Sequence, residues 1–146
     1  MVSSLKNRVL VFGTFDLLHA GHLHFLCDAK ALGSELWVVV ARDQTVEKLK
    51  GQKPLNPEKK RLKFLQSLWL VDRAVLGLDF FRDKYAIVKK INPSVIALGY
   101  DQGISETELR DELSKRRMLV KVVRMKPYKE RIFKTSKLKG YLCACA

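Results

Sequence analysis

Two histidines in the segment Gly13-Thr-Phe-Asp-Leu-Leu-His-Ala-Gly-His22 have a spacing suited to binding an anion. If a helix begins just after His19, then His19 and His22 stand one turn apart at its N-terminus, where free backbone N–H groups and the helix dipole favour negative charge. Gly21 between them removes a side chain where a ligand would approach closely. These residues therefore predict a site for a phosphate group.

All three histidines of the chain lie within six residues, which leaves two other interpretations open. The spacing His-x-x-His-x-His suits a metal ion, and the same histidines would also serve simply as caps of the helix. Neither alternative explains why Gly13, Asp16 and Gly21 accompany them. The third histidine, His24, is expected to face elsewhere and to be structural.

The segment is neither the dinucleotide fingerprint G-x-G-x-x-G nor a P-loop. It resembles, without a gap, the Gly-Thr-Phe-Asp-x-x-His-x-Gly-His signature of the cytidylyltransferase-like nucleotidyltransferase superfamily. The resemblance implies transfer of a nucleotidyl group from a nucleoside triphosphate to a phosphate, with release of pyrophosphate. It also implies a set of nucleotide contacts, from Thr14, Phe15, His19, Ala20, Gly21 and His22, of which the two histidines are catalytic.

Later stretches narrow the resemblance to the archaeal FAD synthases, which adenylylate FMN. They are Ala41-Arg-Asp-Gln-Thr-Val46, Lys50-Gly-Gln-Lys-Pro54 and Leu98-Gly-Tyr-Asp-Gln102. The resemblance implies ATP and FMN as substrates, Lys53 as a catalytic residue and Asp101 beside the nucleotide. Taken alone, Asp101 would be an ordinary turn residue after a strand.

The segment at residues 125–138 departs from the glycerol-phosphate relatives, because their Gly-Ile-Ser sequence is missing before Thr135 and Ser136. A CTP-dependent cytidylyltransferase, acting on glycerol 3-phosphate or a sugar phosphate, is the alternative function. Thr135 and Ser136 match two threonines of the glycerol-phosphate relatives, and Tyr128 matches a tyrosine of the FAD synthases, so these resemblances imply nucleotide contacts from all three. Lys129 and Arg131 carry charges that can neutralise the leaving pyrophosphate. Thr135 and Ser136 would also serve as plain helix N-caps.

The predicted reaction needs no strong general base, because an acceptor phosphate is already an anionic nucleophile. It needs alignment of the acceptor with the α-phosphorus and stabilisation of charge on the phosphoryl oxygens. No carboxylate cage for a metal is apparent in the sequence, so Mg²⁺ or another divalent metal ion is expected to arrive with the nucleotide.

The elements that must position these residues follow from apolar runs that alternate with helical patterns. Strands are predicted at residues 8–12, 36–41, 73–76, 95–98 and 119–124, and helices at 20–32, 43–49, 57–69, 80–91, 106–117 and 134–142. Asp43, Asn56 and Ser105 are the predicted helix caps. Such alternation is typical of a parallel sheet, and ligands of these sheets bind beyond the carboxyl ends of the strands.

We therefore predict an α/β, Rossmann-like single domain over residues 1–146, with a parallel five-stranded sheet and helices on both faces. Its core spans about residues 8–138, and a short tail follows at 139–146. Cys27 lies in an apolar helical pattern and is expected in the core. Cys143 and Cys145 are left out of the predicted site.

The composition favours an anionic partner. The 146 residues carry a net charge of +13, and residues 115–140 hold eleven bases against one acid. Such a segment attracts polyanions, although a solvated basic face or a nucleic-acid-binding module would have the same charge. A nucleic-acid-binding module would not require the histidine motif, so no nucleic acid is expected as a partner.

The longest apolar run, at residues 36–41, is far shorter than the roughly 20 residues that span a bilayer. The first residues lack the pattern of a signal peptide. We therefore expect no membrane partner and a cytoplasmic protein, and the resemblance implies a homodimer.

Overall fold

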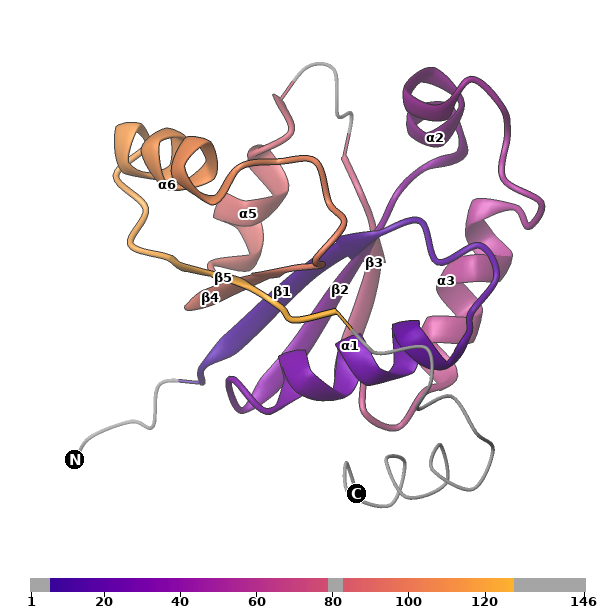
Figure 1. The fold of residues 1–146 in the computed structure, drawn as a ribbon, viewed down its shortest axis with the longest axis horizontal. Helices are drawn as coiled ribbons and strands as arrows, with labels where there is room; N and C mark the ends of the chain where they lie inside the picture. Colours follow the sequence, from indigo (N-terminus) through magenta and orange to yellow (C-terminus); the bar gives the residue numbers. More distant parts are fainter. Residues whose placement is uncertain (1–5, 79–82, 128–146) are drawn as a thin grey trace.

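The computed structural model describes residues 6–78 and 83–127 (Figure 1). Its five strands form a single sheet, namely β1 (Arg8–Gly13), β2 (Glu35–Val40), β3 (Arg73–Leu76), β4 (Val95–Leu98) and β5 (Lys121–Arg124). The strand order is β3-β2-β1-β4-β5 and every pairing is parallel. The predicted five-stranded parallel sheet is confirmed, and β1, which leads into the histidine motif, lies at its centre.

Helices cover both faces of the sheet (Figure 1). They are α1 (Ala20–Lys30), α2 (Asp43–Lys50), α3 (Glu58–Ser67), α5 (Ala86–Ile91) and α6 (Glu106–Lys115). Helices α1 and α3 pack in one buried cluster, and α5 and α6 pack in another on the opposite face. Helix α2 follows β2 directly, so it lies at the carboxyl edge of the sheet where a ligand is expected.

Successive side chains of β1 point to opposite faces of the sheet, so they pack alternately into the two clusters. Val9 and Val11 face the cluster that contains Leu26 of α1 and Leu65 of α3. Leu10 faces the cluster on the other side. A central strand that is apolar on both faces is what a sheet covered by helices on both sides requires. Cys27 is buried in the first cluster, as predicted.

Several predicted element boundaries are wrong. The helix predicted at 80–91 is not continuous, because Lys84 and Tyr85 form a turn before α5 (Ala86–Ile91), and its predicted start at residue 80 lies outside the described part. Asp43 is the first residue of α2 rather than its cap, and the N-cap of α3 is Pro57 rather than the residue before it. The side chain of Asn56 instead contacts Asp16, since its Nδ2 donates to the Asp16 carbonyl. The predicted cap Ser105 is confirmed, since its Oγ accepts a hydrogen bond from Glu108 N.

Two other expectations concern membrane spans and the C-terminal segment. No helix in the described part of the chain is long and apolar enough to cross a membrane. The helix predicted at 134–142 and the tail at 139–146, with Cys143 and Cys145, lie outside it.

Candidate active site

The histidines of the motif cap α1. His19 is the N-cap residue, with extended backbone, and its Nδ1 accepts a hydrogen bond from Gly21 N at 3.0 Å. In return His22 Nδ1 accepts a hydrogen bond from His19 N at 3.3 Å. The two imidazoles thus satisfy two backbone N–H groups that the first turn of a helix leaves without partners. The capping interpretation is confirmed, and it leaves the rest of each ring open to chemistry.

The capping bonds fix which nitrogen of each ring carries a proton. A nitrogen that accepts a hydrogen bond must present a lone pair, so in the neutral rings of His19 and His22 the proton sits on Nε2. Burial, together with the neighbouring His19 ring, lowers the pKa of His22 below its ordinary value near 6.5. His22 is therefore neutral at pH 7, and its Nε2–H is a hydrogen-bond donor for an anion.

Phe15 packs against the histidine pair through its contact with His22. The residue is 6% exposed, and its ring meets the ring of His22 edge-on, with centroids 5.7 Å apart. Its backbone has φ 52°, a left-handed conformation that is strained for a bulky residue. A Cβ at Gly13 would lie 2.6 Å from Phe15 Cε2, so only glycine leaves space for the ring. The rings of His19 and His22 lie close together, with centroids 3.9 Å apart and an interplanar angle of 35°.

Lys50, at the end of α2, brings a positive charge to the motif. Its Nζ donates to Thr14 Oγ1 at 3.4 Å, and its charge contributes to the lowered pKa of His22. Sequence reasoning placed the catalytic lysine at Lys53, which lies exposed in the loop between α2 and α3. Lys50 belongs to the same Lys50-Gly-Gln-Lys-Pro54 stretch, and its contact with Thr14 is one that sequence reasoning missed.

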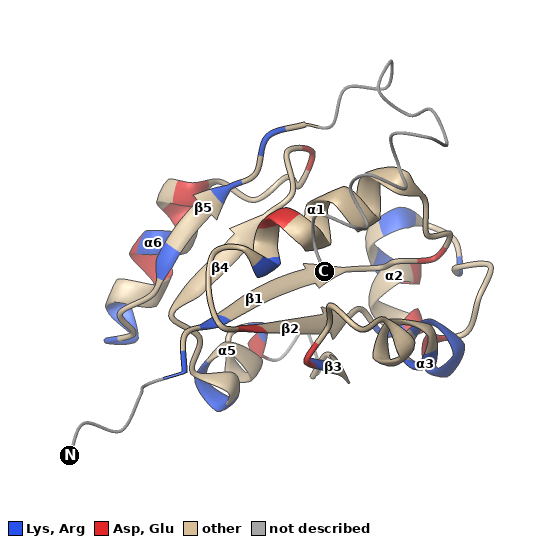
Figure 2. Cartoon of the chain, turned by 90° about the horizontal axis from the view of Figure 1, so that it is seen from below, with Lys and Arg blue, Asp and Glu red and all other residues tan. Residues whose placement is uncertain are grey.

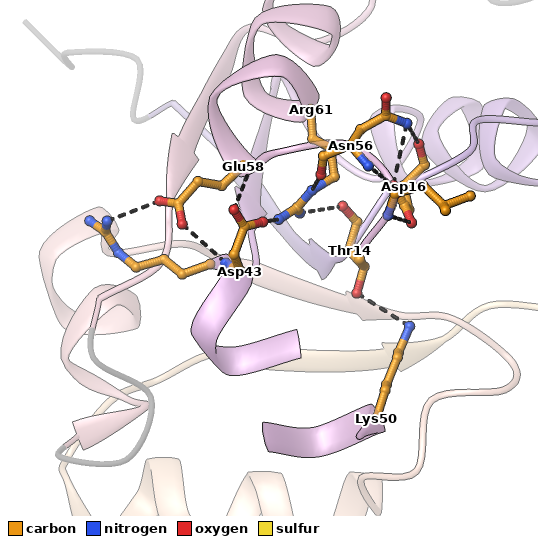
Figure 3. A network of polar contacts seen from close by, with 9 residues as sticks. Thr14, Asp16, Asp43, Lys50, Asn56, Glu58 and Arg61 are labelled. Atoms are coloured by element: carbon orange, nitrogen blue, oxygen red, sulfur yellow. Dashed lines mark hydrogen bonds and ion pairs between the residues drawn. The ribbon is translucent and has the colours of Figure 1, made fainter. Parts of the chain in front are cut away.

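Asp16 joins the motif to the loop at residues 51–57. Its carboxylate accepts hydrogen bonds from Leu55 N at 2.7 Å and from Asn56 N at 2.8 Å. Asn56 Nδ2 donates in turn to the Asp16 carbonyl at 2.7 Å (Figure 3). Although desolvation raises the pKa of Asp16, these hydrogen bonds outweigh it and lower the pKa. Asp16 is thus an anchor for the loop that carries Lys53.

The other side of the site is built by the ends of β4 and β5. Gln102 Oε1 accepts a hydrogen bond from Gly99 N at 2.7 Å, and its Nε2 donates to the Phe12 carbonyl at 3.0 Å. Arg124 donates to the carbonyls of Gly99 and Gln102 at 2.7 and 2.9 Å. Asp101, held in this turn, is exposed, and its charge acts on the pKa of His22 in the raising direction. The structure therefore brings Asp101 to the edge that carries the histidines.

The basic segment is partly neutralised where the structure describes it, as far as residue 127. Figure 2 shows bases and acids interspersed on α6, whereas the charged residues of β5 are all bases. Arg116 pairs with Glu112 at 2.6 Å, and Arg124 pairs with Glu106 at 2.7 Å. These two bases are thus engaged in local ion pairs.

The remaining predicted residues divide into two groups. Ala20 and Gly21 form the first turn of α1, and His24 pairs with Asp28 one turn further on at 2.9 Å. Five residues lie outside the described part of the chain, namely Tyr128, Lys129, Arg131, Thr135 and Ser136.

Within residues 6–78 and 83–127, no three His, Cys, Asp or Glu side chains are grouped so that they could hold a metal ion. The described residues therefore offer no support for the metal-site interpretation.

Residues 10–140 match the family model described as Cytidylyltransferase-like. A curated FAD synthase of Aciduliprofundum boonei is 51% identical over 121 residues, which cover 83% of this chain and 79% of that protein. A curated FAD synthase of Thermococcus sibiricus is 44% identical over 139 residues, which cover 94% of this chain and 93% of that protein.

Solved structures show the same architecture. The lipopolysaccharide core biosynthesis protein from Thermoplasma volcanium superposes with a TM-score of 0.80 at 43% identity, covering 85% of this chain and 99% of that one. A pantoate-beta-alanine ligase from Francisella tularensis superposes with a TM-score of 0.62 at 12% identity, covering 97% of this chain and 72% of that one, which is a likeness of fold alone.

Proposed function

The chain belongs to the cytidylyltransferase-like family, and we propose that it is an FMN adenylyltransferase, which transfers AMP from ATP to FMN to give FAD and pyrophosphate. The similarity to curated FAD synthases over most of the chain supports the choice of substrates. One structural observation supports the chemistry. Both imidazoles at the start of α1 bind backbone amides through Nδ1, which leaves both Nε2–H groups as donors for phosphate oxygens.

The reaction is an in-line displacement. An oxygen of the FMN phosphate attacks the α-phosphorus of ATP, the bond from that phosphorus to the bridging oxygen breaks, and the electron pair leaves with pyrophosphate. His19 and His22 donate Nε2–H bonds to the phosphate oxygens on which charge develops. The Lys50 ammonium and the N-terminus of α1 add positive potential at the same place.

A divalent metal ion suits this reaction because it would neutralise charge on the triphosphate. The described residues contain no group of metal ligands, so we infer that the ion arrives bound to the nucleotide. On the nucleotide side the proposal includes Thr14, Phe15, Ala20, Gly21 and Asp101, together with Tyr128, Thr135 and Ser136. Lys53, Lys129 and Arg131 are proposed for the phosphates, and a homodimer is the proposed assembly.

The test is a pyrophosphate-release assay under reducing conditions that crosses ATP and CTP with FMN and glycerol 3-phosphate, in Mg²⁺ and in Co²⁺ or Mn²⁺. We expect pyrophosphate only with ATP and FMN, with FAD formed in equal amount, and none after chelation of the metal. Release with CTP and glycerol 3-phosphate would replace the substrates and keep the mechanism. Silence in every pairing would refute FMN adenylylation.

A further inference from the structure

Arg61 is a charged side chain that α3 buries almost completely, since its side chain is 1% exposed. A buried guanidinium is costly unless its donors are satisfied. Three nitrogens of Arg61 each donate to a different segment of the chain (Figure 3). Nη1 reaches the Thr14 carbonyl at 2.7 Å, Nε reaches the Asn56 carbonyl at 2.9 Å, and Nη2 reaches Asp43 Oδ1 at 2.7 Å.

These partners come from three segments of the site. Thr14 follows β1 and opens the histidine motif, Asp43 begins α2, and Asn56 ends the loop that carries Lys53. Asp43 is itself fixed to the start of α3, because Asp43 N donates to Glu58 Oε1 at 3.1 Å and Glu58 N donates to Asp43 Oδ2 at 3.3 Å. The guanidinium is therefore the point at which the motif, α2 and the lysine-bearing loop meet.

The bond to Thr14 has a particular consequence for the site. The Thr14 carbonyl belongs to the peptide unit that precedes Phe15, so its direction is tied to the strained φ of 52° at Phe15. A strained backbone conformation persists only where its surroundings determine it. Phe15 in turn packs against His22. Rotation of this peptide would therefore disturb both the Thr14–Lys50 contact and the support of the histidine.

We propose that Arg61 is a positioning residue for the nucleotide half of the site. It sets the orientation of the Thr14–Phe15 peptide and the distance between the motif and the loop carrying Lys53, and it acts through these groups without touching substrate. Its catalytic consequence rests on the proposed function, whereas its effect on the two backbone segments does not.

The test compares Arg61→Lys and Arg61→Met with Arg8→Met. Lysine keeps the charge, but one ammonium cannot hold three acceptors in three directions, so it should not restore the wild-type geometry. Arg8 is the control: it lies at the opposite end of β1 with its side chain 35% exposed, and its Nη1 donates to the Ile91 carbonyl at 2.8 Å. All variants are assayed for FAD formation at a temperature where circular dichroism shows them to be folded.

We expect Arg61→Lys to lower kcat/KM for ATP at least about tenfold, since small misplacements at a reacting centre have effects of this size or larger. Arg8→Met should stay within about twofold of wild type even where its Tm falls. Folded Arg61→Lys with wild-type kcat and KM would overturn the proposal. If Arg61→Met does not fold, Asp43→Asn replaces it, with the same direction expected and unchanged kinetics again overturning the proposal.

A second readout separates this inference from the proposed function. Hydrogen exchange of the backbone amides at residues 14–16 and 55–56 should be faster in Arg61→Lys and unchanged in Arg8→Met. Wild-type protein that forms no FAD would refute the adenylyltransferase alone. Unchanged protection of both segments in Arg61→Lys would overturn the positioning role alone.

Discussion

Replacing His19 by alanine and by asparagine separates its role as a helix cap from its role in chemistry. Alanine loses the bond from Gly21 N to His19 Nδ1, while the reciprocal bond to His22 Nδ1 remains. Loss of one N-cap side chain costs about 1 kcal/mol. Asparagine is among the best N-cap residues and offers a side-chain oxygen in place of Nδ1, so it should cost only a few tenths of that.

The two variants should therefore differ in stability but agree in activity. His19→Ala should lower the Tm by about 3 to 4 °C, as expected for 1 kcal/mol in a domain of this size, and His19→Asn should stay close to wild type. Both should lower kcat by about a hundredfold, because neither supplies the Nε2–H donor. Scanning calorimetry and FAD formation measure the two effects. Full activity of His19→Asn would refute the role of the imidazole, and equal Tm values would refute the cap.

Three further predictions concern the surroundings of the histidines. Gly13→Ala should destabilise the fold by about 1 to 3 kcal/mol in urea unfolding, because the new Cβ would lie 2.6 Å from the buried ring of Phe15; an unchanged midpoint would contradict this. Burial and the neighbouring imidazole lower the pKa of His22 from 6.5, so protonation of His22 favours the unfolded chain. The free energy of unfolding should therefore keep its full value above pH 6.5 and decline as the pH falls below it. This decline should be smaller in His22→Gln. Asp16→Asn should speed amide exchange at Leu55 by about tenfold, since it replaces one carboxylate oxygen by a donor; unchanged protection would show that the carboxylate does not hold the loop.

The fold could be predicted because its signals are local. The apolar run that became β2 and the cap at Ser105 depend on neighbouring residue types, and the structure confirms both. Boundaries failed where a distant contact decides them. Asn56 has the residue type and the position of a helix cap, yet its side chain amide is bound to Asp16, 40 residues earlier.

The histidine pair could be predicted for a similar reason, because its spacing within one helical turn is visible in the chain. Arg61 could not. An arginine in a short helix full of lysines has the pattern of a solvated face, and nothing local indicates that it is buried. Its partner at Thr14 lies 47 residues away, so only the assembled sheet brings them together.

The central place of β1 also bears on the order in which the molecule assembles. Its pairing with β2 closes a short crossover through α1, whereas its pairing with β4 joins Val9 to Val95. Closing the longer loop has the higher entropic cost, so the half containing β4 and β5 is expected to dock late in folding. The hydrogen bond from Gln102 to Phe12 forms only at that point. The carboxyl edge is thus completed by the last docking event. A ligand bound there should therefore slow unfolding and leave the rate of refolding nearly unchanged, because its contacts form only after the rest of the sheet has assembled.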